Sequence, residues 1–302
     1  MRGVGVSELV SAATEGVLFL FAVLTQLGDV WFLLVALALL YWLGTDRLTD
    51  DPRRTGALLI ALALGAFAVT LGLKSAFALA RPPGAASATP PTWLPTSAVP
   101  VFQNIATGTG FGFPSGHALG TTVVYGGLAV LLDVWTRRRR WLAAGAVVAL
   151  VSLSRLALGV HYLVDVAVGA IVGLLFLAGT LRLSRGRPER AFAVAVVVGI
   201  LAVVAATVGN HPVELADALS GLSASVGGLV AWRRIGVTET SVSLSLAGVG
   251  LLLVGGLGVG TRQLNPPLAV SLVGYAVAVA LVVAYPWLVA VVREERRSGE
   301  PS

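Results

Sequence analysis

Cysteine is absent from the 302-residue chain, so neither a disulfide nor a metal site with thiolate ligands can form. Charge is also scarce, because Asp, Glu, Lys and Arg make up only 12% of the residues. A soluble domain carries about 25%. Hydrophobic residues make up 56% of the chain, and the mean hydropathy is +0.88. These values predict an all-α fold, a polytopic transmembrane helical bundle, and argue against a soluble globular domain.

Two further features are missing. A cleavable signal peptide is not predicted, since Glu8 and Glu15 interrupt the first apolar stretch and only Arg2 precedes it. No internal repeat of fixed period is found. The net charge of +6 could suggest nucleic acid, but the arginines fall in short loops between apolar runs. Arginines at such positions set membrane topology, so no nucleic-acid partner is expected.

The apolar runs predict about nine spans at roughly 20 residues per crossing. Residues 6–26 are broken by polar groups and are expected to form an interfacial or re-entrant helix, with a true span as the alternative. The long connection 81–113 is rich in Pro, Ser, Thr and Gly, so it is either a functional cover or disordered. The expected spans are 28–44, 55–79, 115–134, 141–158, 160–182, 191–209, 217–232, 242–260 and 267–292.

The arginines predict the orientation of these spans. Sixteen of them lie in alternate loops and in the tail after residue 292, which places those segments in the cytoplasm. The opposite loops hold few basic residues. We therefore expect a multi-pass protein of the cell membrane in which Lys74, Arg81, Arg155, His117 and His161 all lie near the extracytoplasmic side.

Lysine occurs once, at Lys74, among 21 basic residues. Wherever a topology-setting charge is needed, the chain uses arginine. A single lysine within an apolar span therefore indicates a specific role, such as a compact ammonium at a phosphoryl oxygen. Arg81 follows seven residues later, close to two helical turns, so both cations share a face of the helix that Pro82 ends.

Two other polar stretches fall on the same predicted side. Phe113-Pro114-Ser115-Gly116-His117 opens a span, where free backbone N–H groups and the helix dipole favour an anion. Ser154-Arg155 and His161-x-x-x-Asp165 lie in the third stretch. His161 and Asp165 are four residues apart, and a carboxylate beside an imidazole orients a nucleophile or base. A structural ion pair between Arg155 and Asp165 is the alternative for this stretch alone.

Together these motifs, K-x6-RP, PSGH and SR-x5-H-x3-D, resemble the type 2 phosphatidic acid phosphatase family, the membrane branch of the vanadium haloperoxidase-like superfamily. The resemblance is complete at the motif positions and covers roughly residues 25–182. It implies a core over 1–190 and a C-terminal transmembrane extension of about four helices over 191–302, whose function is unknown.

The resemblance also implies roles for single residues. His161 would attack phosphorus and form a phosphohistidine, oriented by Asp165, and His117 would protonate the leaving oxygen and then activate water. The phosphate-binding residues would be Lys74, Arg81, Ser115, Gly116 and Arg155. No metal and no other cofactor is expected, and the motifs carry no carboxylate cluster of the kind that a two-metal phosphatase requires.

Three features lie outside the motifs. Gly28 and Asp29 could line the site, although a helix cap is the favoured interpretation. His211 is interpreted as a solvated loop residue. The glycines around 248–260 allow close helix packing, so a structural role or a homodimer is expected for the extension.

The function expected from all of this is hydrolysis of an amphiphilic substrate, a lipid phosphate monoester or diphosphate, at the outer membrane face. Phosphatidic acid, phosphatidylglycerophosphate and polyprenyl diphosphates are all candidates, and membrane lipids are the surrounding partners. Two alternatives stay open: a phosphotransferase that uses the same residues, and a transporter or binding protein that keeps the anion site without turnover. A vanadate-dependent oxidation is a remote third.

Overall fold

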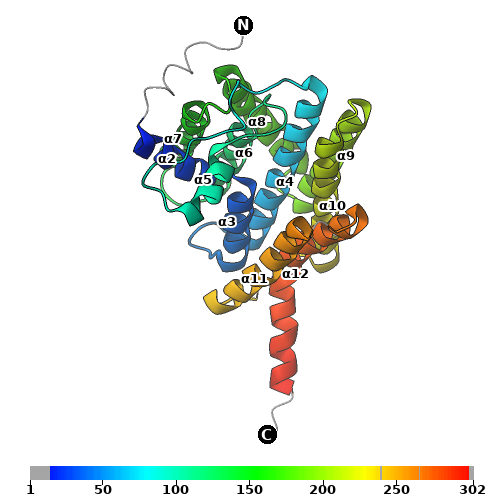
Figure 1. Ribbon diagram of the computed structural model, residues 1–302. Helices are drawn as coiled ribbons and strands as arrows, with labels where there is room; N and C mark the ends of the chain where they lie inside the picture. The colour runs from blue at the N-terminus through cyan, green and yellow to red at the C-terminus, as the bar shows by residue number, and fades with distance from the viewer. Residues whose placement is uncertain (1–13, 239, 265, 299–302) are drawn as a thin grey trace.

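The computed structural model of the chain describes residues 14–238, 240–264 and 266–298. These residues form helices joined by turns and short connections, without a β-strand (Figure 1). The helices, in chain order, are α2 (Glu15–Leu24), η1 (Thr25–Gly28), α3 (Val30–Leu43), α4 (Pro52–Phe77), η2 (Thr96–Ala98), α5 (Val99–Ala106), α6 (Gly116–Leu131), α7 (Arg137–Ala157), α8 (Leu163–Ser184), α9 (Pro188–Val208), α10 (Pro212–Ile235), α11 (Leu244–Gln263) and α12 (Leu268–Ser298).

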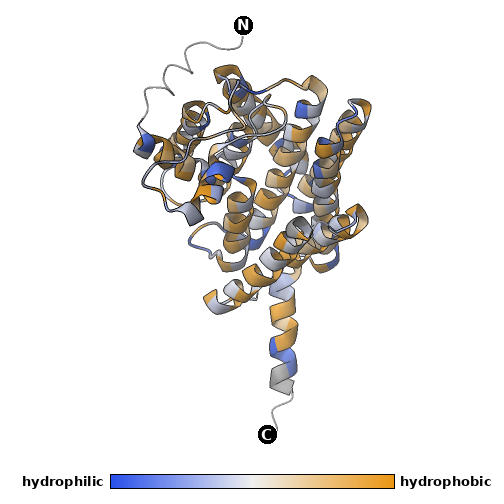
Figure 2. Ribbon diagram, viewed as in Figure 1, coloured by the Kyte–Doolittle hydropathy of each residue, from blue (hydrophilic) through white to orange (hydrophobic). Residues whose placement is uncertain are grey.

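Seven of these helices are long and apolar enough to cross a membrane: α4, α7, α8, α9, α10, α11 and α12. Hydrophobic residues cover most of their length (Figure 2). The expected polytopic helical bundle is therefore confirmed. The expected spans 28–44 and 115–134 correspond to the shorter helices α3 and α6, and α3 meets the length test only together with the segment before it.

The N-terminal helix α2 bends away from α3. The segment Glu15–Gly28 and the helix α3 enclose an angle of 50°, the geometry of a broken span or a re-entrant loop. Residues 6–13 of the expected 6–26 helix lie outside the described residues. The Glu15 carboxylate accepts hydrogen bonds from the backbone N and the hydroxyl of Thr92, at 2.9 and 3.0 Å. The start of α2 therefore lies against the long connection 81–113.

That connection forms an ordered cover, one of the two alternatives left by the sequence. It contains η2 and α5, and buried Phe102 stacks on Phe19 of α2 with ring centroids 6.2 Å apart. Its backbone is tied to the end of the Lys74–Arg81 segment, because Gly112 N donates to Leu79 O at 2.8 Å. Within the connection, Gly108 N donates to Ala85 O, also at 2.8 Å.

Helix α4 is the centre of the bundle, and 72% of its apolar window is buried, against 44% or less in each of the other six. Its ends are well defined. Asp51 caps the start by accepting from Arg54 N at 2.9 Å, with Pro52 in the first turn. Ala78 ends the helix in the left-handed conformation. Lys74 therefore lies in the last turn of the most enclosed helix.

The C-terminal extension shares the hydrophobic core of the preceding helices. The Tyr41 hydroxyl donates to Val283 O at 3.0 Å, and Trp42 Nε1 donates to Val282 O at 2.8 Å. Gly250 of α11 packs closely against Trp42, where a Cβ would lie 2.8 Å from the ring. The other α11 glycines, Gly248, Gly255, Gly256, Gly258 and Gly260, have no such neighbour within 4 Å, so among the described residues of α11 the expected close packing occurs at Gly250 alone.

All three motifs lie at one end of the bundle. Helices α4 and α7 end there, at Phe77 and Ala157, and helices α6 and α8 begin there, at Gly116 and Leu163. The arginine-rich segments lie at the opposite ends of the same helices, for example at Arg137, where α7 begins.

Candidate active site

His161 lies in the turn between α7 and α8, with only 2% of its surface exposed. Its Nδ1 lies 3.6 Å from Oδ2 of Asp165, in the first turn of α8. The same carboxylate oxygen accepts a hydrogen bond from Tyr162 N at 3.0 Å. Asp165 itself is fully buried. The carboxylate is thus held by backbone and faces the imidazole, the relation that fixes a tautomer.

The other ring nitrogen of His161 faces Arg81. Nη1 of Arg81 lies 3.0 Å from Nε2 of His161. A guanidinium only donates, so Nε2 accepts and the ring proton belongs on Nδ1, toward Asp165. Burial lowers the pKa of His161 well below its ordinary value, and the nearby charges of Arg81, Arg155 and Lys74 lower it further. The neutral imidazole, with its Nε2 lone pair aimed at a cation, is the favoured form.

Arg81 is held by the backbone on two sides. Its Nε donates to Thr109 O at 3.0 Å and its Nη1 to Val160 O at 2.9 Å. A Cβ at Gly108 would lie 2.8 Å from Nη1, so glycine is required for the connection to pass this close. Burial lowers the pKa of Arg81, with the Asp165 charge acting in the opposite direction. Arginine nonetheless remains a cation in proteins.

The PSGH motif builds the start of α6. Ser115 is the N-cap, and its hydroxyl accepts from Ala118 N at 3.4 Å. Its amide donates to Asp165 O at 2.9 Å, which joins the second motif to the third. At Gly116 a Cβ would lie 2.9 Å from Cγ2 of Thr70, so the helix start sits directly on α4. The serine hydroxyl therefore accepts the cap hydrogen bond, while the serine amide holds the start of α6 against the start of α8.

His117 enters the same cluster. Its ring packs on Gly28, where a Cβ would lie 3.2 Å from Cδ2. Its Nε2 is buried and has no hydrogen-bond partner among the described residues. It interacts electrostatically with His161 and with all three cations of the motifs, Lys74, Arg81 and Arg155. The two imidazoles therefore lie near each other at the same end of the bundle.

Arg155 closes the site on the side of α2. It is buried, and its Nη1 donates to the Thr25 hydroxyl at 3.1 Å. Asp29 acts on it electrostatically. Asp29 is at the N-cap position of α3, as expected, but its side chain makes no cap hydrogen bond. Gly28 and Asp29 thus line the site as well as begin a helix.

Lys74 completes the cluster in the last turn of α4. Its ammonium forms no hydrogen bond and no ion pair within the described ranges, and it interacts electrostatically with Arg81 and Arg155. The structure therefore brings together every residue that the three motifs had singled out. Groups of three His, Cys, Asp or Glu side chains that could hold a metal ion do not occur in the part of the chain that is described.

Comparisons with known proteins identify the family of this region. Residues 54–189 match the family model of the PAP2 superfamily. This part of the chain is therefore similar to the PAP2 superfamily. The chain is also 34% identical over 82 residues to phosphatidylglycerophosphatase B of Bacillus subtilis (strain 168), an alignment that covers 25% of the chain and 40% of that relative. The chain thus matches about two fifths of the relative's length. No solved structure is significantly similar to it.

The site also contains residues outside the PAP2 region. Thr25 and Asp29 precede it, while Glu214 and Asp217 of α10 follow it and interact electrostatically with Lys74. His211, interpreted from the sequence as a solvated loop residue, is half-buried, and its ring packs on Phe111 with centroids 4.6 Å apart. The only sequence signal for these groups was their position at the outer ends of helices.

Proposed function

We propose that the chain is an integral membrane phosphatase that hydrolyses lipid phosphate monoesters or diphosphates through a phosphohistidine intermediate on His161. One observation carries this proposal. The Nε2 lone pair of His161 faces the Arg81 guanidinium at 3.0 Å while Nδ1 faces the Asp165 carboxylate at 3.6 Å. A neutral imidazole held this way is a nucleophile aimed at the point where a cation would bind a phosphoryl oxygen.

In the first step, Nε2 of His161 attacks phosphorus. A P–N bond forms as the P–O bond to the leaving group breaks. His117, protonated while the phosphate anion is bound among the cations, gives its proton to the departing oxygen. The positive charge that develops on the His161 ring is stabilised by Asp165 at Nδ1. The buried, unpartnered Nε2 of His117 supports its assignment as the proton donor.

In the second step, water replaces the histidine. His117, now neutral, takes a proton from a water molecule whose oxygen attacks phosphorus, and the P–N bond breaks. Inorganic phosphate leaves and His161 returns to its neutral form. Lys74, Arg81 and Arg155, with the Ser115 hydroxyl and the backbone N–H group of Gly116, would stabilise the charge on the phosphoryl oxygens in both steps. No step in this scheme calls for a metal ion.

The location of the site supports a substrate in the membrane. The motifs lie at one end of apolar helices, and the arginine-rich segments lie at the other. The positive-inside rule then assigns the site to the extracytoplasmic side of the cell membrane. The similarity to phosphatidylglycerophosphatase B supports a phosphorylated lipid as substrate. Phosphatidic acid, phosphatidylglycerophosphate and polyprenyl diphosphates all satisfy this chemistry.

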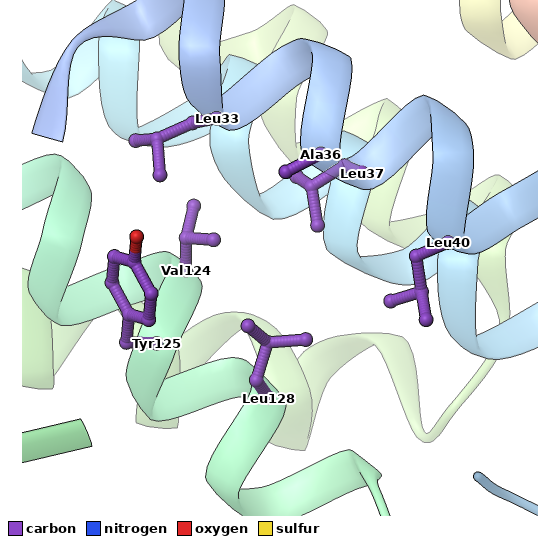
Figure 3. A pocket seen from close by; sticks show the side chains of 7 residues that line it. All are labelled: Leu33, Ala36, Leu37, Leu40, Val124, Tyr125 and Leu128. Atoms are coloured by element: carbon purple, nitrogen blue, oxygen red, sulfur yellow. The ribbon is translucent and has the colours of Figure 1, made fainter. Parts of the chain in front are cut away.

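An apolar groove provides a position for the lipid tail. It lies between α3 and α6, has a volume of about 210 Å³, and is lined by leucines of α3 facing Val124, Tyr125 and Leu128 across an open space (Figure 3). On α6, the positions 117, 121, 124 and 128 fall on one face of the helix. The groove therefore lies on the helix face that carries His117, further along the helix.

The chemistry favours this side of the site for the tail. Attack by His161 and departure of the leaving group occur roughly in line, on opposite sides of phosphorus. The lipid is bonded to the leaving oxygen, which must lie next to the proton donor His117. The tail must therefore leave the site on the His117 side, and the groove between α3 and α6 lies on that side.

Phosphate release from purified protein in detergent tests the proposal. The panel contains phosphatidic acid, phosphatidylglycerophosphate, a polyprenyl diphosphate and a short water-soluble phosphate monoester. We expect turnover that His161→Ala abolishes, that vanadate inhibits and that EDTA leaves intact. A ³²P label transferred to the protein should be acid-labile and absent from His161→Ala.

Three outcomes would contradict the proposal. Absence of phosphate release from every lipid, with lipid binding unaffected by His161→Ala, would favour a transporter or binding protein. A labelled phosphoryl group found on an added lipid alcohol instead of in free phosphate would identify a phosphotransferase. Activity that requires Mg²⁺ would exclude the metal-free mechanism.

A further inference from the structure

The turn between α9 and α10 lies in the C-terminal extension, beyond the PAP2 region, yet it reaches the candidate site. Its backbone is well defined, because His211 N donates to Ala206 O and Leu215 N donates to His211 O, both at 2.9 Å. The His211 ring folds over Gly209, where a Cβ would lie only 2.5 Å from Cδ2. The direction of the imidazole is therefore fixed by the turn itself.

This turn contacts the glycine-rich loop 108–113 at two points. The His211 ring packs on Phe111, with centroids 4.6 Å apart and an interplanar angle of 70°, the edge-to-face geometry that aromatic pairs prefer. One turn further along α10, Oε1 of Glu214 lies 3.3 Å from the position of a Cβ at Gly110. Helix α10 thus begins directly against the loop.

The opposite side of the same loop holds Arg81. Thr109 O accepts from Arg81 Nε at 3.0 Å, and Gly108 and Gly112 both lie against the Arg81 side chain. Three of the five residues from 108 to 112 are glycines, so the loop has little conformational restraint of its own. The position of the loop therefore depends on the residues that pack against it. Phe111 is the large apolar side chain through which the loop contacts the extension.

We propose that His211 is a positioning residue for the phosphoryl-transfer site. Its ring holds Phe111, Phe111 fixes the loop, and the loop holds Arg81 against Nε2 of His161. The inference rests on the proposed function, since Arg81 and His161 are assigned there to phosphate binding and attack. It gives the extension a part in the reaction beyond anchoring the bundle.

The required property of His211 is its flat ring, not its protonation. His211→Ala should lower kcat about tenfold or more, because small misplacements of binding groups reduce rates steeply. The same variant should weaken inhibition by vanadate, which occupies the phosphoryl position. His211→Phe keeps a ring of similar size and should restore both kcat and vanadate inhibition, with an unchanged pH profile. Val213→Ala, an exposed position in the same turn, is the matched control.

A double-mutant cycle makes the test specific. Phe111→Ala should resemble His211→Ala, and the double variant should be no worse than either one, because the two changes break the same contact. Thermal unfolding in detergent shows whether a variant is merely less stable. Wild-type kcat in His211→Ala, or full additivity with Phe111→Ala, would overturn the inference while leaving the proposed function intact. If the wild-type protein releases no phosphate from any substrate, the proposed function itself has failed.

Discussion

The backbone amide of Ser115 donates a hydrogen bond to the carbonyl of Asp165, at 2.9 Å. These residues are 50 positions apart in the sequence and belong to different motifs. The bond joins the start of α6 to the start of α8. It therefore holds the backbone of His117, two residues after Ser115, close to the backbone of His161, four residues before Asp165.

Gly169 keeps this junction close. A Cβ there would lie 2.7 Å from Ser115 O and 3.3 Å from Cβ of Ala118, so Gly169→Ala should push α6 away from α8. We expect phosphatase activity to fall at least about tenfold, since small displacements of reacting groups are costly. Gly179→Ala on the same helix is the control, because no atom lies within 4 Å of its Cβ position. Equal activity in the two variants would contradict this account of the junction.

Asp165→Asn should lower kcat by about 100-fold, at the lower end of the range for groups that support proton transfer. The amide keeps the shape of the carboxylate but cannot stabilise the positive charge that develops on His161. Steady-state phosphate release measures the effect, and thermal unfolding of the variant in detergent serves as the control. A kcat within a few-fold of wild type would show that the 3.6 Å contact with His161 is structural only.

On the acidic side of the pH profile, kcat/KM should fall as His161 becomes protonated. This part of the profile, the acidic limb, therefore reports the pKa of His161. Burial and the cations lower its pKa, so the neutral nucleophile persists to pH values below the ordinary pKa of histidine. Arg81→Gln removes the nearest of those cations, which should raise the pKa of His161 and move the acidic limb to higher pH. The substrate titrates identically in both assays, so the difference belongs to the protein. Arg140→Gln, at the opposite end of α7, should leave the limb in place.

The groove between α3 and α6 can be blocked without touching the motifs. Ala36→Phe should lower kcat/KM for a long-chain lipid phosphate at least several-fold, because one buried methylene is worth about 0.8 kcal/mol. Turnover of a short water-soluble phosphate should be unaffected. Ala205→Phe blocks a second apolar groove, between α4 and α9, and is the matched control. If Ala205→Phe alone lowered kcat/KM for the long-chain lipid, the tail would instead be assigned to the groove between α4 and α9.

The sequence was sufficient for the helices and for the identity of the polar cluster. Long apolar runs with few charges have few structural solutions in a membrane, since every backbone group must be bonded within the chain. Rare ionisable residues in such runs are informative for the same reason, as with Lys74 and His161. The short helix α6 and the bend between α2 and α3 were less predictable, because both depend on neighbouring helices.

The contributions of other segments were not visible in the sequence. His211 matched no motif, and its contact with Phe111 joins residues 100 positions apart. The interpretation of Asp29 as a cap was incomplete, because its carboxylate acts on Arg155 in a distant helix. Long-range contacts of this kind follow from how helices pack, and helix periodicity does not encode which outer turns will meet.

The sequence by itself determined a bundle of apolar helices with two histidines, three cations and one aspartate at a common end, because hydrophobicity and charge dictate what can cross a membrane. Only the tertiary structure decided which atoms face each other. Nε2 of His161 faces Arg81, Nδ1 faces Asp165, and His211 of the extension packs on Phe111 of the loop that contacts Arg81. Those relations depend on the close approach of helices far apart in the chain, and packing geometry, rather than composition, sets such distances.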